Sequence, residues 1–472
     1  MTLVMKFGGT SVGGAQAMGA TAELILQTQA AHGPVVVVAS AMGSQPVKVT
    51  GLLLQGARAA FAGESAYRAL AEQVRAIHYA AIDALLEPEA ERQQILAENS
   101  AFIDRYVALC AAVQVLAELT PRALDAISGM GEQMSVRILA AYLRQLGHKA
   151  QALDATELIV TDDNFQNAGP DYALTQARVT AWLPPLLAEG IIPIVTGFIG
   201  ATAGGVTTTL GRGGSDFSAA ILGQALPADE VWIWTDVDGV MSADPRLVPG
   251  ARSIPTLSYR EVSELAYYGA KVLHPKTMRP CVDNGIPLRI KNTFNPAHPG
   301  TVIVKNGQAP NGAIKAVTAI RGLSLINVEG TGMVGVPGIA ARAFGAVARG
   351  RVSVLLITQA SSEQSICFAV PATAVDSVLA GLESEFAHEL QRRDIDGVWA
   401  LRDVAIVTIV GAGMRGTPGI AGCIFSALGA HAVNVIAIAQ GSSECSISVV
   451  VDGADTATAV ARIHDLIVPA RP

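Results

Sequence analysis

The sequence has few cysteines and aromatic residues, and it has no long run of one charge or of apolar residues. Its five cysteines are scattered without CxxC spacing, and its eight histidines form no HExxH-type cluster. This pattern argues against a zinc site and a disulfide framework. No Lys/Arg run stands out, so nucleic acid is not an expected partner, and no apolar run could cross a bilayer. Because the N-terminus enters a strand pattern without a signal-peptide core, we expect a cytoplasmic protein without a membrane partner.

Apolar residues are plentiful, making up 50% of the 472 residues, whereas charged residues make up 15%. A chain of this length and composition can bury a large core and predicts two to four domains. The formal net charge is −7. A small anionic ligand would therefore have to be held by local donors rather than by a general positive field.

The first 300 residues alternate strand and helix patterns. Uninterrupted apolar runs at Val35–Ala39, Ile191–Val195 and Val231–Thr235 are typical of strands buried on both faces. Helical patterns cover Met134–Leu146 and Asp216–Leu226 between such runs. This order predicts an α/β fold whose mostly parallel sheet is covered by helices on both faces.

Two stretches depart from this alternation. Residues from about 52 to 126 are rich in Ala, Leu, Glu, Gln and Arg with apolar residues at helical spacing, which predicts an excursion of two or three helices. The segment Asn292–Gly312 is full of Pro, Gly and Asn, and we place the main domain boundary there.

Beyond this boundary the sequence repeats itself at an offset of 81 residues. Pro337–Ala340 returns as Pro418–Ala421, and Ile357–Gln359 returns as Ile438–Gln440. Each copy has the pattern strand, Gly/Pro loop, helix, strand, turn, strand. The repeat predicts two similar βαββαβ modules packed together.

A glycine-rich turn follows the first strand pattern, in the sequence Lys6-Phe7-Gly8-Gly9-Thr10-Ser11. Glycines let backbone N–H groups approach an anion, and Lys6 can neutralise phosphate charge. The GxxxxGK[ST] spacing of a P-loop is absent. Taken alone, a phosphate cradle and an ordinary strand-to-helix turn are near-even interpretations.

A second glycine-rich segment runs from Thr207 to Ala220 and contains Arg212 between glycines. A guanidinium in such a loop can bind a carboxylate with two parallel hydrogen bonds. Ser215 or Asp216 could serve only as the cap of the helix that follows. Capping does not account for the arginine, so the segment favours a binding function.

Three further motifs are weaker alone. The run Trp234–Val240 ends a buried strand in Thr-Asp, where α/β folds bind ligands, although Asp238 fits an ordinary turn. Lys271 could reach a nucleotide phosphate, although any single lysine is ordinarily a solvated surface residue. Glu132 starts a helix, where an acid complements the helix dipole. A functional Glu132 would have to face an ammonium group.

Together, KFGGTSVG, SGMGEQMS, VTGFIG, TTTLGRGGSDFSAA, IWTDVDGVMSADPR and YYGAKVLHP resemble the aspartate kinase family over essentially the whole chain. The C-terminal pair resembles tandem ACT domains. The resemblance implies an amino-acid-kinase three-layer αβα sandwich followed by two ferredoxin-like βαββαβ ACT domains. It also implies transfer of the ATP γ-phosphoryl group to the β-carboxylate of L-aspartate, with Mg²⁺. Other amino-acid kinases, or a catalytically weak amino-acid-binding regulator, are the alternatives.

The resemblance implies roles for individual residues. The catalytic residues would be Lys6, Arg212 and Asp216. The substrate pocket would comprise Ser40, Thr50, Glu132, Phe198, Arg212, Gly213, Gly214 and Ser215. The nucleotide would be held by Lys6, Phe7, Gly8, Gly9, Thr10, Ser11, Thr235, Asp236, Met241, Arg246, Lys271 and Val272. Where the family often has tyrosine, this chain has Met241.

The resemblance also implies a domain plan and a form of regulation. The kinase domain would span 1–305, the first ACT domain 321–392, and the second 312–320 plus 400–472. The regulatory part is most similar to the kinase half of bifunctional aspartate kinase–homoserine dehydrogenases, in which the counterparts of Gln359 and Gln440 contact threonine. Threonine is the first expected effector and lysine the second, acting on a homodimer or homotetramer.

Overall fold

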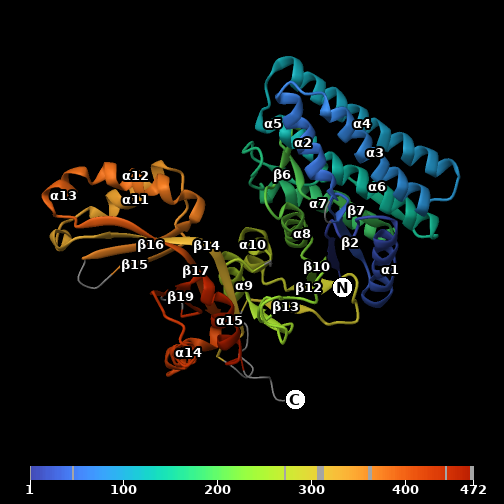
Figure 1. Cartoon of the computed structure of the whole chain (residues 1–472). Helices are drawn as coiled ribbons and strands as arrows, with labels where there is room; N and C mark the ends of the chain where they lie inside the picture. The colour runs from blue at the N-terminus through green and yellow to red at the C-terminus, as the bar shows by residue number, and fades with distance from the viewer. Residues whose placement is uncertain are drawn as a thin grey trace. The chain divides into compact units, whose positions relative to one another are not determined.

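The computed structural model of the chain describes residues 2–44, 47–270, 273–305, 313–359, 364–441 and 444–467. It divides into two compact units (Figure 1). The first unit comprises Met1–Val240, Pro255–Tyr259 and Leu273–Gly307, and the second comprises Met241–Ile254, Arg260–Val272 and Gln308–Pro472. Two stretches from within the N-terminal 300 residues thus pack with the C-terminal unit, an assignment that the sequence patterns did not indicate.

The first unit is built on an eight-stranded sheet with the order β11-β13-β12-β10-β1-β2-β7-β5. All neighbouring strands are parallel except β12 and β13. The strands are β1 (Leu3–Phe7), β2 (Val35–Ala39), β5 (Ala150–Leu153), β7 (Ile192–Thr196), β10 (Glu230–Thr235), β11 (Thr256–Ser258), β12 (Leu288–Asn292) and β13 (Thr301–Val304). Small sheets pair β3 (Gly43–Ser44) with β4 (Val47–Lys48), and β6 (Val160–Thr161), β8 (Ile199–Thr202) and β9 (Thr207–Thr209) with one another.

Every residue of β1, β2 and β7 is buried, as the uninterrupted apolar runs predict for strands covered on both faces. Helices α1 and α6 contact each other and the sheet, and α7, α8 and α10 form a second group that also contacts it. Their bounds are α1 (Ala15–His32), α6 (Met130–Gln145), α7 (Tyr172–Ala188), α8 (Gly214–Ala225) and α10 (Pro275–Asn284). The expected α/β sandwich is confirmed.

The predicted helical excursion contains four helices rather than two or three. They are α2 (Val49–Phe61), α3 (Ala66–Leu85), α4 (Ala90–Leu116) and α5 (Pro121–Ser128). The last of them, α5, is short. Its start is fixed locally, because Thr120 Oγ1 accepts a hydrogen bond from Ala123 N–H and Pro121 occupies the first helical position.

The second unit contains a six-stranded sheet with the order β15-β16-β14-β17-β19-β18. Its strands are β14 (Ala316–Glu329), β15 (Leu356–Gln359), β16 (Ser365–Pro371), β17 (Gly397–Val410), β18 (Ala437–Gln440) and β19 (Ser446–Asp452). Its helices are α9 (Tyr259–Tyr267, with Tyr259 in the first unit), α11 (Ile339–Arg349), α12 (Val375–Glu385), α13 (Ala387–Arg392), α14 (Ile420–Gly429) and α15 (Thr456–His464).

The two central strands, β14 and β17, each serve both repeats. Ala316–Ile320 pairs with Ile406–Val410, whereas Leu323–Glu329 pairs with Gly397–Val404 after a register shift. The first copy therefore combines the second half of β14 with β15 and β16, and the second copy combines the second half of β17 with β18 and β19. Each copy borrows its fourth strand from the other long strand.

Short elements complete the chain. Single 3₁₀ turns are η1 (Ala155–Glu157), η2 (Thr331–Met333), η3 (Ala372–Ala374), η4 (Ala412–Met414) and η5 (Gly453–Asp455). No helix in the described part of the chain combines the length and the apolar character that a bilayer span requires.

Candidate active site

The carboxyl ends of four neighbouring strands, β10, β1, β2 and β7, meet at one edge of the large sheet. Phe7 is in register with Ala39 and with Trp234, and Ala39 is in register with Thr196. Beyond these ends, Ser40 N–H donates to Phe7 O at 3.1 Å. The segments that follow the four strands therefore begin side by side, at the position where parallel sheets bind ligands.

The glycine turn after β1 is closed by backbone hydrogen bonds. Gly8 N–H donates to Trp234 O at 3.2 Å, and Ser11 N–H donates to Gly8 O at 2.9 Å. A Cβ on Gly9 would lie 3.1 Å from Ala41 O, which is tighter than ordinary contacts. The turn thus requires glycine because backbone from the segment after β2 packs directly against it.

Ser11 belongs to the frame of this turn. Its side chain is fully buried, and its Oγ lies 2.7 Å from Thr293 Oγ1 in a hydrogen bond. Ser11 O also accepts a hydrogen bond from Thr21 Oγ1 at 2.7 Å. Because the Ser11 hydroxyl and N–H are both engaged inside the protein, this residue positions the turn.

Lys6 and Asp216 form an ion pair at the same edge. Lys6 lies in β1, and its Nζ is 2.6 Å from Oδ1 of Asp216 in the first turn of α8. Their side chains are 11% and 18% exposed. The ion pair therefore orients the Lys6 ammonium. The pair places a positive charge above the glycine turn, since Nζ is 3.5 Å from a Cβ built on Gly8.

The start of α8 differs from the capping interpretation. The N-cap position is occupied by Gly213 in a left-handed conformation, and no side chain caps the helix. Ser215 and Asp216 lie in the first turn, so neither is the cap. Asp216 instead pairs with Lys6, so the capping role that was weighed as the alternative to a binding function does not apply to either residue.

Arg212 lies in the loop just before α8, between Gly211 and Gly213, which both have positive φ. Its side chain is exposed and has no ion pair with another described residue. Burial, Arg212 and Lys276 together lower the pKa of His274, which places the arginine near the start of α10. His274 itself caps that helix, since its Nδ1 accepts from Lys276 N–H at 3.2 Å. The loop therefore presents an unpaired guanidinium.

Phe198, Gly214 and Ser215 meet beside the end of β7. A Cβ on Gly197 would lie 2.6 Å from Ser215 Cβ, and a Cβ on Gly214 would lie 2.6 Å from Phe198 Cδ2. Phe198 has φ of 70°, which is unusual for a bulky residue and marks backbone held by its surroundings. The backbone contacts that hold it include Leu210 N–H donating to Phe198 O at 2.9 Å.

Glu132 is buried in the first turn of α6 with only 4% of its surface exposed. Burial raises the pKa of its carboxyl to about 8, although hydrogen bonds from the backbone of Ala41 and of Glu132 itself oppose the shift. Oε2 has no hydrogen-bond partner among the described residues. The carboxyl is held next to the segment that follows β2 and retains an unused acceptor. A buried acid in this condition is suited to a cationic group.

Asp125 was not indicated by the sequence, although it supports the loop that carries Arg212. This carboxylate, 1% exposed, accepts hydrogen bonds from Thr209 N–H at 2.9 Å, Thr209 Oγ1 at 2.7 Å and Gln166 N–H at 2.9 Å. Thr209 ends β9, three residues before Arg212. An acid on an amphipathic helix is ordinarily read as solvent-facing, so no sequence signal distinguished Asp125.

The other predicted residues of the first unit lie near the sheet edge. Thr50 is in the first turn of α2, whose first residue, Val49, donates its N–H to Met42 O at 3.1 Å. Thr235 Oγ1 donates to Asp236 Oδ1 at 3.2 Å. The predicted residues that are neither buried nor exposed are Gly8, Gly9, Thr10, Ser40, Thr50, Phe198, Gly213, Ser215, Asp216 and Thr235.

The remaining predicted nucleotide residues are not in the described part of the first unit. Met241 and Arg246 belong to the second unit, where Arg246 Nη2 lies 2.6 Å from Asp244 Oδ2 on the surface. Lys271 and Val272 lie outside the described residues.

Comparisons with known proteins agree with this architecture. The amino acid kinase family matches residues 1–292, and an ACT domain family matches residues 326–386 and 407–466. Aspartokinase 2 of Arabidopsis thaliana, a chloroplastic protein, is 34% identical over 98% of this chain and 84% of its own length. The chain belongs to the aspartokinase family.

Other aspartokinases are similar to this chain in sequence and in structure. Bifunctional aspartokinase/homoserine dehydrogenase 1 of Zea mays is 38% identical over 98% of the chain, and the chain spans about half the length of such bifunctional relatives. Escherichia coli aspartokinase III, solved with aspartate and ADP, superposes with a TM-score of 0.78 at 31% identity, covering 99% of both chains. Its complex with lysine and aspartate gives a TM-score of 0.80 with the same coverage.

In this chain, the two ACT copies carry matching cavities. A cavity of about 330 Å³ includes Gln359 and the loop Gly335–Ala340, and one of about 350 Å³ includes Gln440 and the loop Gly416–Ala421. The lining residues correspond at the offset of 81 found in the sequence. Neither glutamine side chain has a hydrogen bond to another described residue. The repeat has thus duplicated a small-molecule-sized hollow with an amide at its wall.

Proposed function

We propose that this chain is an ATP-dependent aspartate kinase, forming 4-phospho-L-aspartate in the first step of lysine, threonine and methionine biosynthesis. The observation that carries the proposal is Glu132, whose buried carboxyl has an unused oxygen and a pKa raised to about 8. The α-ammonium of an amino acid would supply the missing partner. The aspartate and ADP bound to the Escherichia coli relative support this choice.

Arg212 and Glu132 would fix the amino-acid substrate by its backbone groups. The guanidinium has no ionic partner in the part of the chain that the structure describes, so it would be free to hold the α-carboxylate with two parallel hydrogen bonds. Glu132 would accept from the α-ammonium. Gly213, Gly214 and Ser215, with Ser40, Thr50 and Phe198, would complete the pocket. This arrangement leaves the side-chain carboxylate of the substrate as the reacting group.

The glycine turn and Lys6 fit a polyphosphate. A Cβ on Gly9 would lie only 3.1 Å from Ala41 O, and the Lys6 ammonium, oriented by Asp216 at 2.6 Å, lies above the turn. The turn would hold the phosphates of ATP together with Phe7 and Thr10, and Thr235, Asp236, Met241, Arg246, Lys271 and Val272 would hold the rest of the nucleotide. Mg²⁺, bound with the phosphates, would screen their negative charge; no residue of this chain is assigned to it.

The reaction then requires positioning rather than a general base. A β-carboxylate oxygen of aspartate is already deprotonated at neutral pH, and it would form a bond to the γ-phosphorus while the bond to the ADP oxygen breaks. Lys6 would screen the repulsion between the two anions and stabilise charge on the transferring group.

The decisive experiment measures ADP release by the purified chain with L-aspartate, L-glutamate and N-acetyl-L-glutamate as acceptors. We expect turnover with aspartate and at least a hundredfold lower kcat/KM with the other two. Turnover with glutamate but not with aspartate would identify a different amino-acid kinase. Absence of turnover with every acceptor, in protein that still binds aspartate by calorimetry, would identify a binding regulator.

We propose further that the two glutamine cavities bind an amino-acid effector, with threonine favoured over lysine. Gln359 and Gln440 offer unpaired amides in equivalent cavities, and the Escherichia coli relative solved with lysine supports an amino acid as the ligand class. Inhibition by threonine that weakens at least fivefold in Gln359→Ala and Gln440→Ala is the expected result. Inhibition by neither amino acid would remove this part of the proposal. Oligomer size, dimer or tetramer, stays a prediction.

A further inference from the structure

The loop after β12, residues 293–300, lies at the carboxyl edge of the kinase sheet beside the segments that follow β1 and β10. Thr235 is in register with Asn292, so β10 and β12 end together. Thr293 N–H donates to Thr235 O at 2.9 Å, and Thr293 Oγ1 lies 2.7 Å from the Oγ of Ser11 in the glycine turn. The loop therefore belongs to the same edge as the proposed phosphate site, although its sequence pattern predicted only a domain boundary.

Hydrogen bonds hold the backbone of this loop on both sides of Phe294. Asn292 Nδ2 and Asn295 Nδ2 donate to Asp238 Oδ1 at 2.8 and 3.0 Å, which joins the loop to the segment after β10. Phe294 N–H donates to Asn292 Oδ1 at 2.9 Å, and His298 N–H donates to Asn295 O at 3.1 Å. The polar groups of the loop thus fix its position.

The Phe294 side chain takes no part in this network. It is 57% exposed, and its ring has no aromatic or cationic partner among the described residues. A ring with only two side-chain torsions on a fixed backbone loses little conformational entropy when a ligand covers it. Phe294 is therefore suited to stacking on a planar group.

The order of the strands decides which part of ATP would meet this loop. The proposed phosphate site follows β1, and the proposed aspartate pocket follows β2 and β7, whereas β10 and β12 lie on the other side of β1. Because the γ-phosphate must face the acceptor, the adenosine end of ATP has to extend away from it, over β10 and β12. Neighbouring strands are about 4.8 Å apart, so β12 lies about 10 Å from β1 across the sheet. The loop after β12 is therefore placed for the base rather than for the phosphates.

The residues proposed to hold ATP include no accessible ring. Only Phe7 among them is aromatic, and it is fully buried in β1, where it stacks on Trp234 with 5.8 Å between ring centroids. Trp234 is itself only 2% exposed. Neither ring can cover a face of the base, whereas the Phe294 ring can.

We propose that Phe294 stacks on the adenine base of ATP and contributes to nucleotide affinity. The inference rests on the proposed ATP-dependent kinase function and adds a residue outside the motifs that predicted it. Stacking acts on the face of the base, whereas Lys6 and the glycine turn act on the phosphates. Phe294 should therefore affect nucleotide binding without affecting phosphoryl transfer.

The test combines calorimetric titration of the full chain with Mg·ADP and steady-state kinetics of ATP and aspartate. Phe294→Ala should raise the dissociation constant of ADP and KM for ATP about tenfold, equivalent to about 1.4 kcal/mol, because base–aromatic stacking is lost. Both kcat and KM for aspartate should change less than twofold. Phe294→Trp should bind ADP at least as tightly as the wild type, and Phe294→Leu, which keeps apolar surface without a ring, should bind it more weakly.

A matched substitution and a ligand without a base serve as controls. Phe61, the last residue of α2, is 52% exposed, so Phe61→Ala removes an equally exposed ring from the helical excursion. It should leave the dissociation constant of ADP within twofold of the wild type. Inorganic tripolyphosphate with Mg²⁺ carries the phosphates alone, and its inhibition constant against ATP should be the same in Phe294→Ala and the wild type.

Three results would overturn the stacking role. They are equal ADP affinity in Phe294→Ala and the wild type, equal weakening by Phe294→Ala and Phe61→Ala, or a loss of tripolyphosphate affinity in Phe294→Ala as large as the loss for ADP. Failure of the proposed function looks different. A wild-type chain that binds Mg·ADP through Phe294 but does not phosphorylate aspartate would keep the stacking role and change the acceptor, whereas a wild-type chain that binds no ADP would remove both.

Discussion

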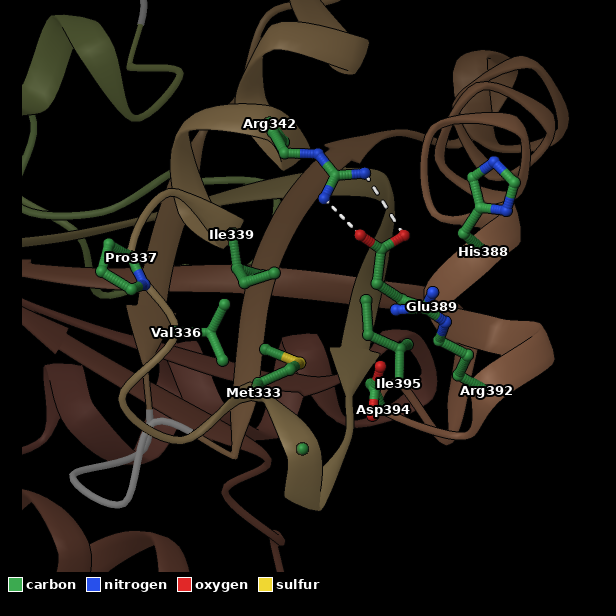
Figure 2. A pocket seen from close by; sticks show the side chains of 11 residues that line it. Met333, Val336, Pro337, Ile339, Arg342, His388, Glu389, Arg392, Asp394 and Ile395 are labelled. Carbon is green, nitrogen blue, oxygen red and sulfur yellow. Dashed lines mark hydrogen bonds and ion pairs between the residues drawn. The ribbon is translucent and has the colours of Figure 1, made fainter.

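The carboxyl edge of the kinase sheet and the α13 cleft, a cavity of about 270 Å³ between the loop before α11 and the short helix α13 (Figure 2), place charged side chains in two contrasting conditions. At the sheet edge, Lys6 and Asp216 are 2.6 Å apart, whereas Arg212 has no ion pair among the described residues. In the cleft, Arg342 is bonded to two glutamates, whereas Arg392 has no such partner. The two regions share neither sequence nor fold. In both, ion-paired side chains stand beside charges that have no partner among the described residues.

This contrast distinguishes the residues that hold a site in shape from the residues that would contact its ligand. Side chains whose hydrogen-bonding capacity is used within the protein hold backbone segments together. Charged side chains left unpaired, particularly buried ones such as Glu132, carry a desolvation penalty that protonation or a bound group of opposite charge removes. If the distinction holds, substitutions in the two classes should affect different quantities, stability in one and ligand affinity in the other.

The largest effect is expected for Arg212→Ala. Loss of the unpaired guanidinium should lower kcat/KM for aspartate by about a hundredfold or more, because it removes both charge and orientation from the α-carboxylate. The melting temperature should change little, since the side chain is exposed and unpaired. Steady-state ADP release at varied aspartate concentration measures kcat/KM, and thermal unfolding measures the melting temperature.

Arg122→Ala is the matched control for that substitution. Arg122 is an exposed arginine on α5, and its loss should leave kcat/KM within about twofold. Near-normal activity in Arg212→Ala would end the assignment of this residue to the substrate.

The next largest effect is expected for Glu132→Gln, which keeps the shape but cannot pair with an ammonium ion. KM for aspartate should rise about 10- to 100-fold, and KM for ATP should change much less. In the wild type the pKa of about 8 means that free Glu132 is protonated near pH 7. Aspartate binding must then release a proton, so KM for aspartate should fall as pH rises from 6 to 8.

Glu132 also predicts how the stability of the folded chain depends on pH. A rise in pH should improve aspartate binding but lower the stability of the ligand-free protein. Because the pKa of Glu132 in the folded chain exceeds its ordinary value of 4.5, ligand-free protein loses stability at this group as pH rises from about 4.5 through about 8. Glu132→Gln should abolish that loss. A difference in melting temperature between variant and wild type that is the same at pH 6 and pH 8.5 would contradict the burial argument, as would an unchanged KM profile.

A smaller, mainly structural effect is expected for Asp125→Asn. The amide would place N–H groups against the donors of Thr209 and Gln166, which costs about 1–3 kcal/mol of unfolding free energy. Because β9 leads into the Arg212 loop, KM for aspartate should rise severalfold while KM for ATP stays nearly constant. Denaturant unfolding and two-substrate kinetics measure these quantities.

Thr209→Val provides the graded comparison for Asp125→Asn. It removes only the hydroxyl that donates to Asp125 Oδ1 and should cost about 1 kcal/mol with a smaller KM change. An equal rise in both KM values for Asp125→Asn would show general loosening of the fold rather than positioning of this loop.

The smallest effect is expected for Thr417→Val, which makes the second glutamine cavity like the first, where Val336 stands. The Thr417 hydroxyl already donates to Gly413 O at 2.7 Å, so we expect it to hold the loop in shape rather than to contact the effector. Effector inhibition constants should stay within about threefold of the wild type, whereas Gln440→Ala should shift them more. A larger effect of Thr417→Val than of Gln440→Ala would reverse the distinction between paired and unpaired groups.

Local sequence patterns predicted the elements that local physics controls. Val35–Ala39 was placed to the residue, and Ile191–Val195 was placed within one residue of the strand Ile192–Thr196. Uninterrupted β-branched runs identify strands buried on both faces. The duplicated modules were equally visible, because repetition at a fixed offset is a property of the sequence itself.

The errors arose where distant segments meet. Asp216 resembled a helix cap, but Lys6 from β1 lies within 2.6 Å of it. Asp125 carried no signal because its three donors come from Thr209 and Gln166, 41 or more positions away along the chain. The excursion has four helices rather than the predicted two or three, and α5, only eight residues long, is too short to show a clear helical period.

The sequence by itself determined the order of strands and helices, the duplicated C-terminal modules and the residue types available for phosphate and carboxylate binding. Only the tertiary structure decided which of those residues are paired. Pairing depends on the parallel register that brings the ends of β10, β1, β2 and β7 to one edge. Burial and distance between residues far apart in the chain set the electrostatics of Glu132, Lys6 and Arg392, and neither quantity is encoded in any single motif.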